Sequence, residues 1–242
     1  MEFVTISDVT VQQAVERIEK LLQERNKLHM NDLEDFNEIL RDETIKVESA
    51  HEKTHYIEHA KNLLRFLEHK DEYTKGHCER VTEYTIAIGR AMEFDDNDIM
   101  HLELAGMLHD IGKLAVPDEI INKEGKLTEQ EYEIIKGHPA AGYRLLENIT
   151  FLETSKSILL QHHERVDGKG YPLGLRDSEI NLCSKIISVA DAYDAMTSSR
   201  PYRKSALSKE QAMQQLEICK GSQFDRNIVD VFIELLKSEN DI

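Results

Sequence analysis

The sequence predicts an all-α protein, and three observations carry that prediction. All 11 glycines and all 4 prolines of the 242-residue chain lie at or beyond Gly76, so the residues before it contain no helix breaker. From Gly76 onward, apolar residues recur at helical spacing between short connections. No stretch of useful length alternates apolar and polar residues as a half-buried strand would.

Two long helices are expected before Gly76, the first over about 11–27 and the second from Asn31 or Asp32 to about Leu67. The second helix is mostly polar in the middle and carries an apolar stripe at each end. It therefore needs a partner that buries the two apolar stripes. We interpret 1–70 as a packing arm or dimerisation region, with the remnant of a sensor module as the alternative. A homodimer through these helices is the expectation, although they could instead fold back on their own chain.

The remaining helices follow from apolar spacing and from capping residues. Helices are expected over 81–92 and, after an N-cap cluster at 95–98, over the segment that carries Leu102 and Leu108; both should be amphipathic. Thr128 with Glu131, and Ser208 with Gln211, match the capping box and mark two further helix starts. The apolar repeats at 186–193 and 228–235 predict the last two helices.

Composition excludes several classes of function. With 30 Lys+Arg against 46 Asp+Glu, the net charge of −16 repels nucleic-acid backbones, so no polymeric nucleic acid is expected as a partner. No apolar run of 18 residues and no signal peptide is present, so no membrane insertion and a cytoplasmic location are expected. Three cysteines without CxxC spacing argue against a disulfide framework or a thiolate zinc site.

The strongest chemical signal is a set of histidines in short contexts with carboxylates, glycines or another histidine. His109 and Asp110 end an otherwise apolar helix, where a polar pair needs compensation. A metal ion would supply it, and a carboxylate such as Asp110 could bridge two ions. The five histidines in this set are His77, His109, His138, His162 and His163.

His162 and His163 are consecutive, so on a helix their side chains would point about 100° apart. They can therefore share a site only near a helix end or by approaching the site from two sides. Asp191 lies in a later helix among apolar residues and also requires a cation or donors. Each residue alone is more often structural. Together, the seven nitrogen and oxygen ligands predict a pair of Fe or Mn ions, which suits phosphoester hydrolysis.

Two further segments are candidates for substrate binding. The loop at 162–175 is rich in turn residues and directly follows the histidine pair, although an ordinary surface connection is the alternative. Arg200 and Arg203 follow Asp191 and offer local positive charge for a phosphate, although a bare pair of arginines is more often solvated surface.

With these residues in view, the chain from Asp71 to Leu236 resembles the HD-GYP subgroup of the HD phosphohydrolase superfamily. The motifs that carry the resemblance are DEYTKGHCERV, LHDIGKLAVPD, HPAAGYRLL, HHERVDGKGYPLGL, VADAYDAMTSSRPYR and GSQFDRNIVDVF. The resemblance implies a helical catalytic domain over 71–242. It also implies hydrolysis of the bacterial second messenger cyclic di-GMP, to pGpG or onward to GMP, by a hydroxide activated by two metal ions.

The resemblance also implies roles for individual residues. The general metal ligands would be His77, His109, Asp110 and Asp191, and the second metal would add His138, His162 and His163. Lys113 would contact the scissile phosphate and help to protonate the leaving oxygen; on a helix continuing from His109 it would face the metals, unless Gly112 ends that helix. Substrate contacts would come from Gly170, Tyr171, Pro172, Arg200 and Arg203, and the carboxylates that orient a ligand or water would be Asp71 and Asp194.

The chain departs from the family pattern at three positions. Tyr73 stands where members with a third metal carry glutamate, which favours two metals over three. The loop at 162–175 carries the GYP signature at residues 170–172 and is called the signature loop. Asp177 and Asn181 stand where the family often has Gly and Pro after this loop, and they touch no ligand position. Iron or manganese is expected as the bound metal, with nickel and zinc also compatible.

Two alternatives to hydrolysis of cyclic di-GMP are a non-catalytic cyclic di-GMP-responsive binding module and a phosphodiesterase for another cyclic dinucleotide.

Overall fold

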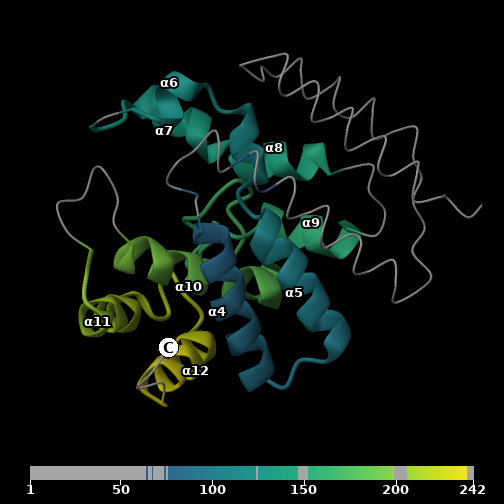
Figure 1. Cartoon of the computed structure of the whole chain (residues 1–242), viewed down its shortest axis with the longest axis vertical. Coiled ribbons are helices and arrows are strands. Elements are labelled where there is room, and N and C mark those ends of the chain that lie inside the picture. The colour runs from purple at the N-terminus through teal and green to yellow at the C-terminus, as the bar shows by residue number, and fades with distance from the viewer. Residues whose placement is uncertain are drawn as a thin grey trace, which may run out of the picture.

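The structure is a computed structural model that describes residues 64, 67, 74, 76–123, 125–146, 152–198 and 206–238 (Figure 1). The described residues confirm the all-α class, because they contain helices and only two isolated β-bridges. The elements are α4 (His77–Ala91), α5 (Asp96–Leu108), η1 (Ile111–Ala115), α6 (Asp118–Ile121), α7 (Glu129–Lys136), α8 (His138–Leu145), α9 (Glu153–Leu160), η3 (Asp177–Glu179), α10 (Leu182–Thr197), α11 (Lys209–Cys219) and α12 (Arg226–Ser238).

The helix starts predicted from capping residues are confirmed. The Asp95 side chain accepts a hydrogen bond from the Asp98 backbone amide at 2.8 Å. Thr128 and Glu131 bond each other's backbone amides, and so do Ser208 and Gln211, which makes two complete capping boxes. These bonds satisfy amide donors that the first turn of a helix otherwise leaves unpaired.

Helices α4 and α5 lie side by side at the centre of the fold (Figure 1). Gly106 allows their close approach, because a Cβ there would stand 2.9 Å from the Thr82 hydroxyl oxygen. The expectation that α5 is amphipathic is wrong, since Leu102 and every residue from Leu104 to Leu108 are buried. Its second half is covered on all sides, as in a central core helix.

An aromatic cluster joins α4 to the C-terminal helices. Tyr84 of α4 lies with its ring centroid 5.2 Å from that of Tyr193 on α10 and 5.6 Å from that of Phe232 on α12. Tyr84 and Tyr193 meet edge to face, and aromatic contacts at these distances stabilise the fold beyond the burial of the rings. Helix α10 is thereby fixed against α4, and the two helices carry candidate ligands that face each other.

The short helix η1 packs against the start of α8 without an intervening side chain. A Cβ at Gly112 would fall 1.9 Å from the His138 carbonyl oxygen and 2.4 Å from the Gly142 amide nitrogen. Only glycine permits this approach, and it brings Asp110, two residues earlier, close to His138.

Most of the predicted N-terminal region lies outside the described residues, including both long helices and the expected dimer contact. Leu64 and Leu67 are described, and both are buried in one core cluster with residues of α5, η1, α8 and α9. Among the described helices, none is both long and apolar enough to cross a bilayer.

Candidate metal centre

The seven side chains predicted as metal ligands come together at the meeting point of five helices. His77 is the first residue of α4 and His138 the first of α8. His109 caps the C-terminus of α5 and is followed by Asp110. His162 and His163 come directly after α9, which is the first of the two arrangements that allow consecutive histidines to share a site. Asp191 projects from the middle of α10.

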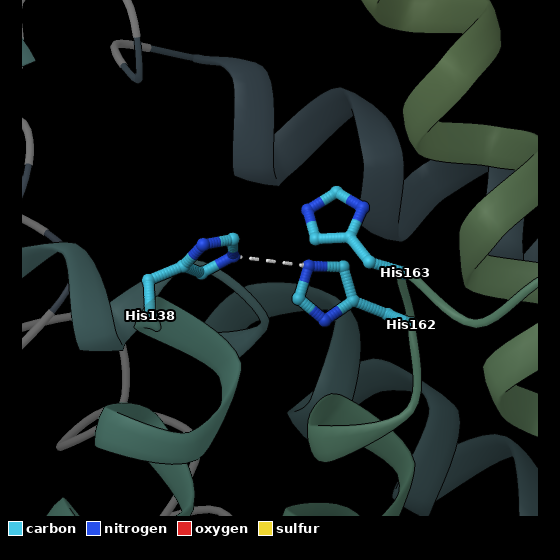
Figure 2. Close-up of side chains that lie close together, drawn as sticks. All are labelled: His138, His162 and His163. Atoms are coloured by element: carbon cyan, nitrogen blue, oxygen red, sulfur yellow. Dashed lines mark hydrogen bonds between the residues drawn. The ribbon is translucent and has the colours of Figure 1, made fainter. Parts of the chain in front are cut away.

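Their ligand atoms form two groups of three. The first group is His138, His162 and His163, whose rings converge in Figure 2 from the start of α8 and from the segment after α9. The second group is His77, His109 and Asp191. Within each group the candidate ligand atoms lie within 4.8 Å of one another, a spacing that one metal ion can bridge.

Asp110 lies between the two groups. Its Oδ1 is 3.3 Å from Nε2 of His138 in the first group. Its Oδ2 is 3.5 Å from Nε2 of His109 and 3.7 Å from Nε2 of His77 in the second. Each carboxylate oxygen therefore faces a different group, which is the arrangement a bridging ligand needs.

Hydrogen bonds at the far side of each ring show that these histidines suit a cation. Nδ1 of His109, His138 and His162 bonds the carbonyl oxygens of Gly106, Ile135 and Leu159 respectively, three residues earlier in each case. A carbonyl oxygen only accepts, so Nδ1 carries the proton and a neutral ring presents the Nε2 lone pair to the site.

None of these three Nε2 atoms has a suitable hydrogen-bond partner. Nε2 of His109 is buried and has no hydrogen-bond partner in the described structure. Nε2 of His138 and Nε2 of His162 face each other at 3.3 Å (Figure 2), and two bare lone pairs repel at that distance. One positive ion in each group would resolve both problems, so the residues fit the metal pair that the resemblance implies.

The shifted pKa values keep most of these side chains in the protonation state that binds a metal ion. Burial lowers the pKa of His163 to about 3, with a further contribution from His138, and burial also lowers the pKa values of His109 and His162. Burial alone would raise the pKa of Asp110, but the charge of Lys113 and the neighbouring histidines hold it well below its usual range. Neutral imidazoles and ionised carboxylates bind metals without first losing a proton.

His77 differs because it lies between two carboxylates. Its Nε2 is 3.2 Å from Asp191, and its Nδ1 is 2.6 Å from Asp194. Burial lowers the pKa of His77, but the bonds to Asp191 and Asp194 outweigh it and raise the pKa to about 9. A metal at this group would therefore displace a proton from Nε2.

Asp194 connects α10 to α4 behind the candidate ligands. Besides His77, it accepts hydrogen bonds from Arg80 at 2.5 and 3.1 Å and from the Ser198 hydroxyl at 3.1 Å. A carboxylate that bonds the outer nitrogen of a ligand histidine fixes the orientation of its ring. This contact is compatible with the orienting role that the resemblance implies for Asp194, and Arg80 is a neighbour that sequence reasoning missed.

Lys113 also reaches the cluster, although not from a continuing α-helix. Helix α5 ends at Leu108, and Lys113 lies in the 3₁₀-helix η1. The Lys113 ammonium donates to Oδ2 of Asp110 at 2.7 Å.

Buried Cys78 is a second neighbour that sequence reasoning left out. Its sulfur lies within 4.8 Å of ligand atoms of His109 and Asp110.

The signature loop is fastened to the segment that carries the histidine pair. The Tyr171 amide donates to the His163 carbonyl at 3.2 Å, and a Cβ at Gly170 would stand 2.4 to 2.6 Å from three backbone atoms of residues 163–165. Buried Glu164 accepts from the amides of residues 173, 174 and 175 at 2.6, 3.1 and 2.9 Å. Sequence reasoning missed Glu164, although its position directly after two candidate ligands was a signal.

A cavity of about 540 Å³ adjoins the cluster and ends at His163 and Asp191. Gly170 and Tyr171 line it, whereas Pro172 is exposed and outside the lining. Asp71, Tyr73, Arg200 and Arg203 lie outside the described residues. The complete lining is Tyr132, Lys136, His163, Glu164, Arg165, Lys169, Gly170, Tyr171, Ser188, Asp191, Ala192 and Gln223.

Comparison with known proteins matches this part of the chain to characterised families. Residues 61–228 match the family model of the HD domain. A cyclic di-GMP phosphodiesterase from Thermotoga maritima is 39% identical over 177 residues, which are 72% of this chain and 48% of that protein. A 3'3'-cGAMP-specific phosphodiesterase from Vibrio cholerae is 41% identical over 139 residues, which are 57% of this chain and 30% of that protein.

Among solved structures, an HDG"Y"P protein from Bdellovibrio bacteriovorus matches with a TM-score of 0.59 and 19% sequence identity, covering 85% of this chain and 69% of that one. At that identity the match shows the fold. The chain spans about half the length of the Thermotoga relative and less of the Vibrio one.

Proposed function

The chain belongs to the HD domain family, and from that premise we propose that it is a metal-dependent phosphodiesterase that hydrolyses cyclic di-GMP to pGpG or onward to GMP. The observation that carries the proposal is the carboxylate of Asp110, whose two oxygens face two separate groups of histidine nitrogens. A bridging carboxylate between two ligand sets is typical of two-metal sites for displacement at phosphorus.

The metal ligands in this proposal are divided as the geometry suggests. His138, His162 and His163 would hold one ion, His77, His109 and Asp191 the other, and Asp110 would bridge them. Two bound divalent ions lower the pKa of water and neutralise charge on a phosphate. Nitrogen and oxygen donors suit iron or manganese, and they also accept nickel and zinc.

The chain's own groups have separate tasks in the proposed reaction. Lys113 lies at the edge of the cluster, with its side chain 19% exposed, and is proposed to contact the scissile phosphate and to donate the proton that the leaving oxygen takes up. Asp194 keeps the His77 ring in place, and Glu164 keeps the signature loop against the histidine pair. Asp71, Arg200, Arg203 and Pro172 remain proposed contacts of ligand or substrate.

A second cyclic dinucleotide is a candidate substrate, because the Vibrio relative named for 3'3'-cGAMP has 41% identity to this chain. A non-catalytic binding module for cyclic di-GMP is the alternative of a different class. For the whole chain we propose a catalytic unit over 71–242 and an N-terminal arm over 1–70 that forms a homodimer.

The test is an anaerobic incubation of the iron- or manganese-loaded protein with cyclic di-GMP and, in parallel, 3'3'-cGAMP, with chromatographic separation of substrate, pGpG and GMP. Asp110→Ala should abolish product and reduce bound metal, whereas Asp98→Ala at the exposed start of the preceding helix should preserve both. Full activity in a metal-depleted Asp110→Ala variant would overturn the scheme. Binding without product, in protein that holds two metals, would favour the binding module.

A further inference from the structure

Helix α7, an element with no assigned role, contributes side chains to the wall of the cavity that His163 and Asp191 also line. Tyr132 and Lys136 lie four residues apart on this helix, so they share one face, and both line the cavity. Helix α7 ends at Lys136, two residues before the candidate ligand His138. The position of α7 is therefore tied to the metal centre through α8.

Tyr132 is unusually open for a large aromatic side chain. It is 46% exposed, whereas the Tyr171 ring already packs at 4.8 Å from the His163 ring. An exposed ring at the edge of a cavity offers a face on which a nucleobase can stack, and such stacking tolerates any base. A cavity of about 540 Å³ is within the range that binds small molecules.

Lys136 is held over both aromatic rings. Its Nζ lies 5.1 Å from the Tyr132 ring centroid and 5.9 Å from the Tyr171 ring centroid. Glu133 accepts from this ammonium at 2.6 Å, and the Lys136 side chain is 30% exposed. An ammonium has three donors and no acceptor, so Lys136 can donate to a ligand while it keeps the bond to Glu133.

The Lys136 ammonium can distinguish one base from another by the atoms on the edge of the base. Guanine presents two acceptors, O6 and N7, on the same edge, whereas adenine presents N7 beside an amino group that only donates. A lysine ammonium matches the guanine edge and leaves the adenine amino group without a partner.

We propose that Tyr132 and Lys136 form the base-binding wall of the substrate site, with Tyr132 stacking on the base and Lys136 selecting guanine over adenine. The inference rests on the proposed function, because the ligand is the guanine nucleotide unit of that reaction. It assigns specificity to α7, outside the metal ligands and outside the signature loop.

The test measures binding of GMP and AMP to the metal-loaded protein by titration calorimetry, since neither mononucleotide contains a phosphodiester bond that the enzyme could cleave. Wild-type protein should bind GMP more tightly. Lys136→Met should reduce the GMP-to-AMP affinity ratio by roughly 5- to 150-fold, the range for loss of a specific base contact. Lys136→Arg should retain the preference, and Tyr132→Ala should weaken both nucleotides by similar factors.

Lys220→Met is the matched control, because this lysine is outside the cavity lining and pairs with Glu217 and Asp230. Metal content is measured in every variant. An unchanged ratio in Lys136→Met with full metal content would overturn the inference, and so would the absence of GMP binding to wild-type protein. Preserved GMP preference without hydrolysis of any cyclic dinucleotide would instead overturn the proposed function and leave this wall intact.

Discussion

Removal of the Glu164 carboxylate should release the signature loop from the histidine pair. In the native structure this buried side chain accepts three backbone amides, from residues 173 to 175, at 2.6, 3.1 and 2.9 Å. Hydrogen bonds to a charged group contribute about 1.5–3 kcal/mol each, so the three together have an upper limit of about 4.5–9 kcal/mol.

The net effect should be smaller than this limit. Leu173 and Gly174 are exposed, so their amides can bond water when the carboxylate is lost. The loop also keeps the bond from the Tyr171 amide to the His163 carbonyl. Counting the equivalent of one or two full bonds gives about 3 kcal/mol, which corresponds to roughly a 150-fold shift of the equilibrium from the ordered toward the released loop.

The assay is steady-state hydrolysis of cyclic di-GMP by Glu164→Ala, with metal content measured on the same samples. KM should rise by up to roughly 150-fold while kcat changes far less, because substrate must then order the loop on binding. Glu164→Gln should be intermediate, since it keeps one acceptor oxygen. Glu179→Ala is the matched control, because that carboxylate is exposed and accepts a single amide. An unchanged KM in Glu164→Ala would refute the reasoning, and loss of metal would show that Glu164 acts through the neighbouring histidine instead.

Three further outcomes are expected. Lys113→Ala should keep both metals and slow turnover at saturating substrate; loss of metal would assign Lys113 a structural role. Gly112→Ala should lower the midpoint of thermal unfolding and reduce bound metal, because the new Cβ falls 1.9 Å from a carbonyl oxygen of α8, whereas Gly137→Ala, with its nearest atom at 3.1 Å, should change little. The chelator-treated protein should lose stability as the pH falls from 7 to 5, measured as the urea midpoint. The pKa of His163 is lowered to about 3 in the folded protein from 6.5, so unfolded chains take up a proton there that folded ones do not. His77, with a pKa of about 9 in the folded protein, makes a smaller and opposite contribution, which is complete once the pH is below the unfolded value of 6.5. A midpoint that rises over this range would contradict that assignment.

Features encoded over a few residues were predictable from the sequence. The capping boxes at Thr128 and Ser208 depend on side chains three positions apart, so the spacing alone indicates the helix starts. The all-α class follows from helical spacing in the same way. The candidate metal ligands were recognisable because a histidine and an aspartate at the end of an apolar helix need a compensating charge, whatever the surrounding fold.

Features that depend on packing between distant segments were not predictable from the sequence. The expectation of an amphipathic α5 failed because the number of neighbours around a helix is decided by the whole fold. The segment around Tyr132 and Lys136 has the pattern of an exposed helix, and nothing local indicates that it faces His163 and Tyr171.

The sequence by itself determined the helical class and the chemical types of the site, because helix caps, helical spacing and ligand chemistry are properties of short segments. Only the tertiary structure decided how the candidate ligands divide into two groups, that Asp110 lies between them, and which wall of the cavity is aromatic and cationic. Those relations depend on where five helices meet, at the ends of α4, α5, α8 and α9 and the middle of α10. Close approaches such as that of Gly112 to the first turn of α8 fix the relative positions of these helices.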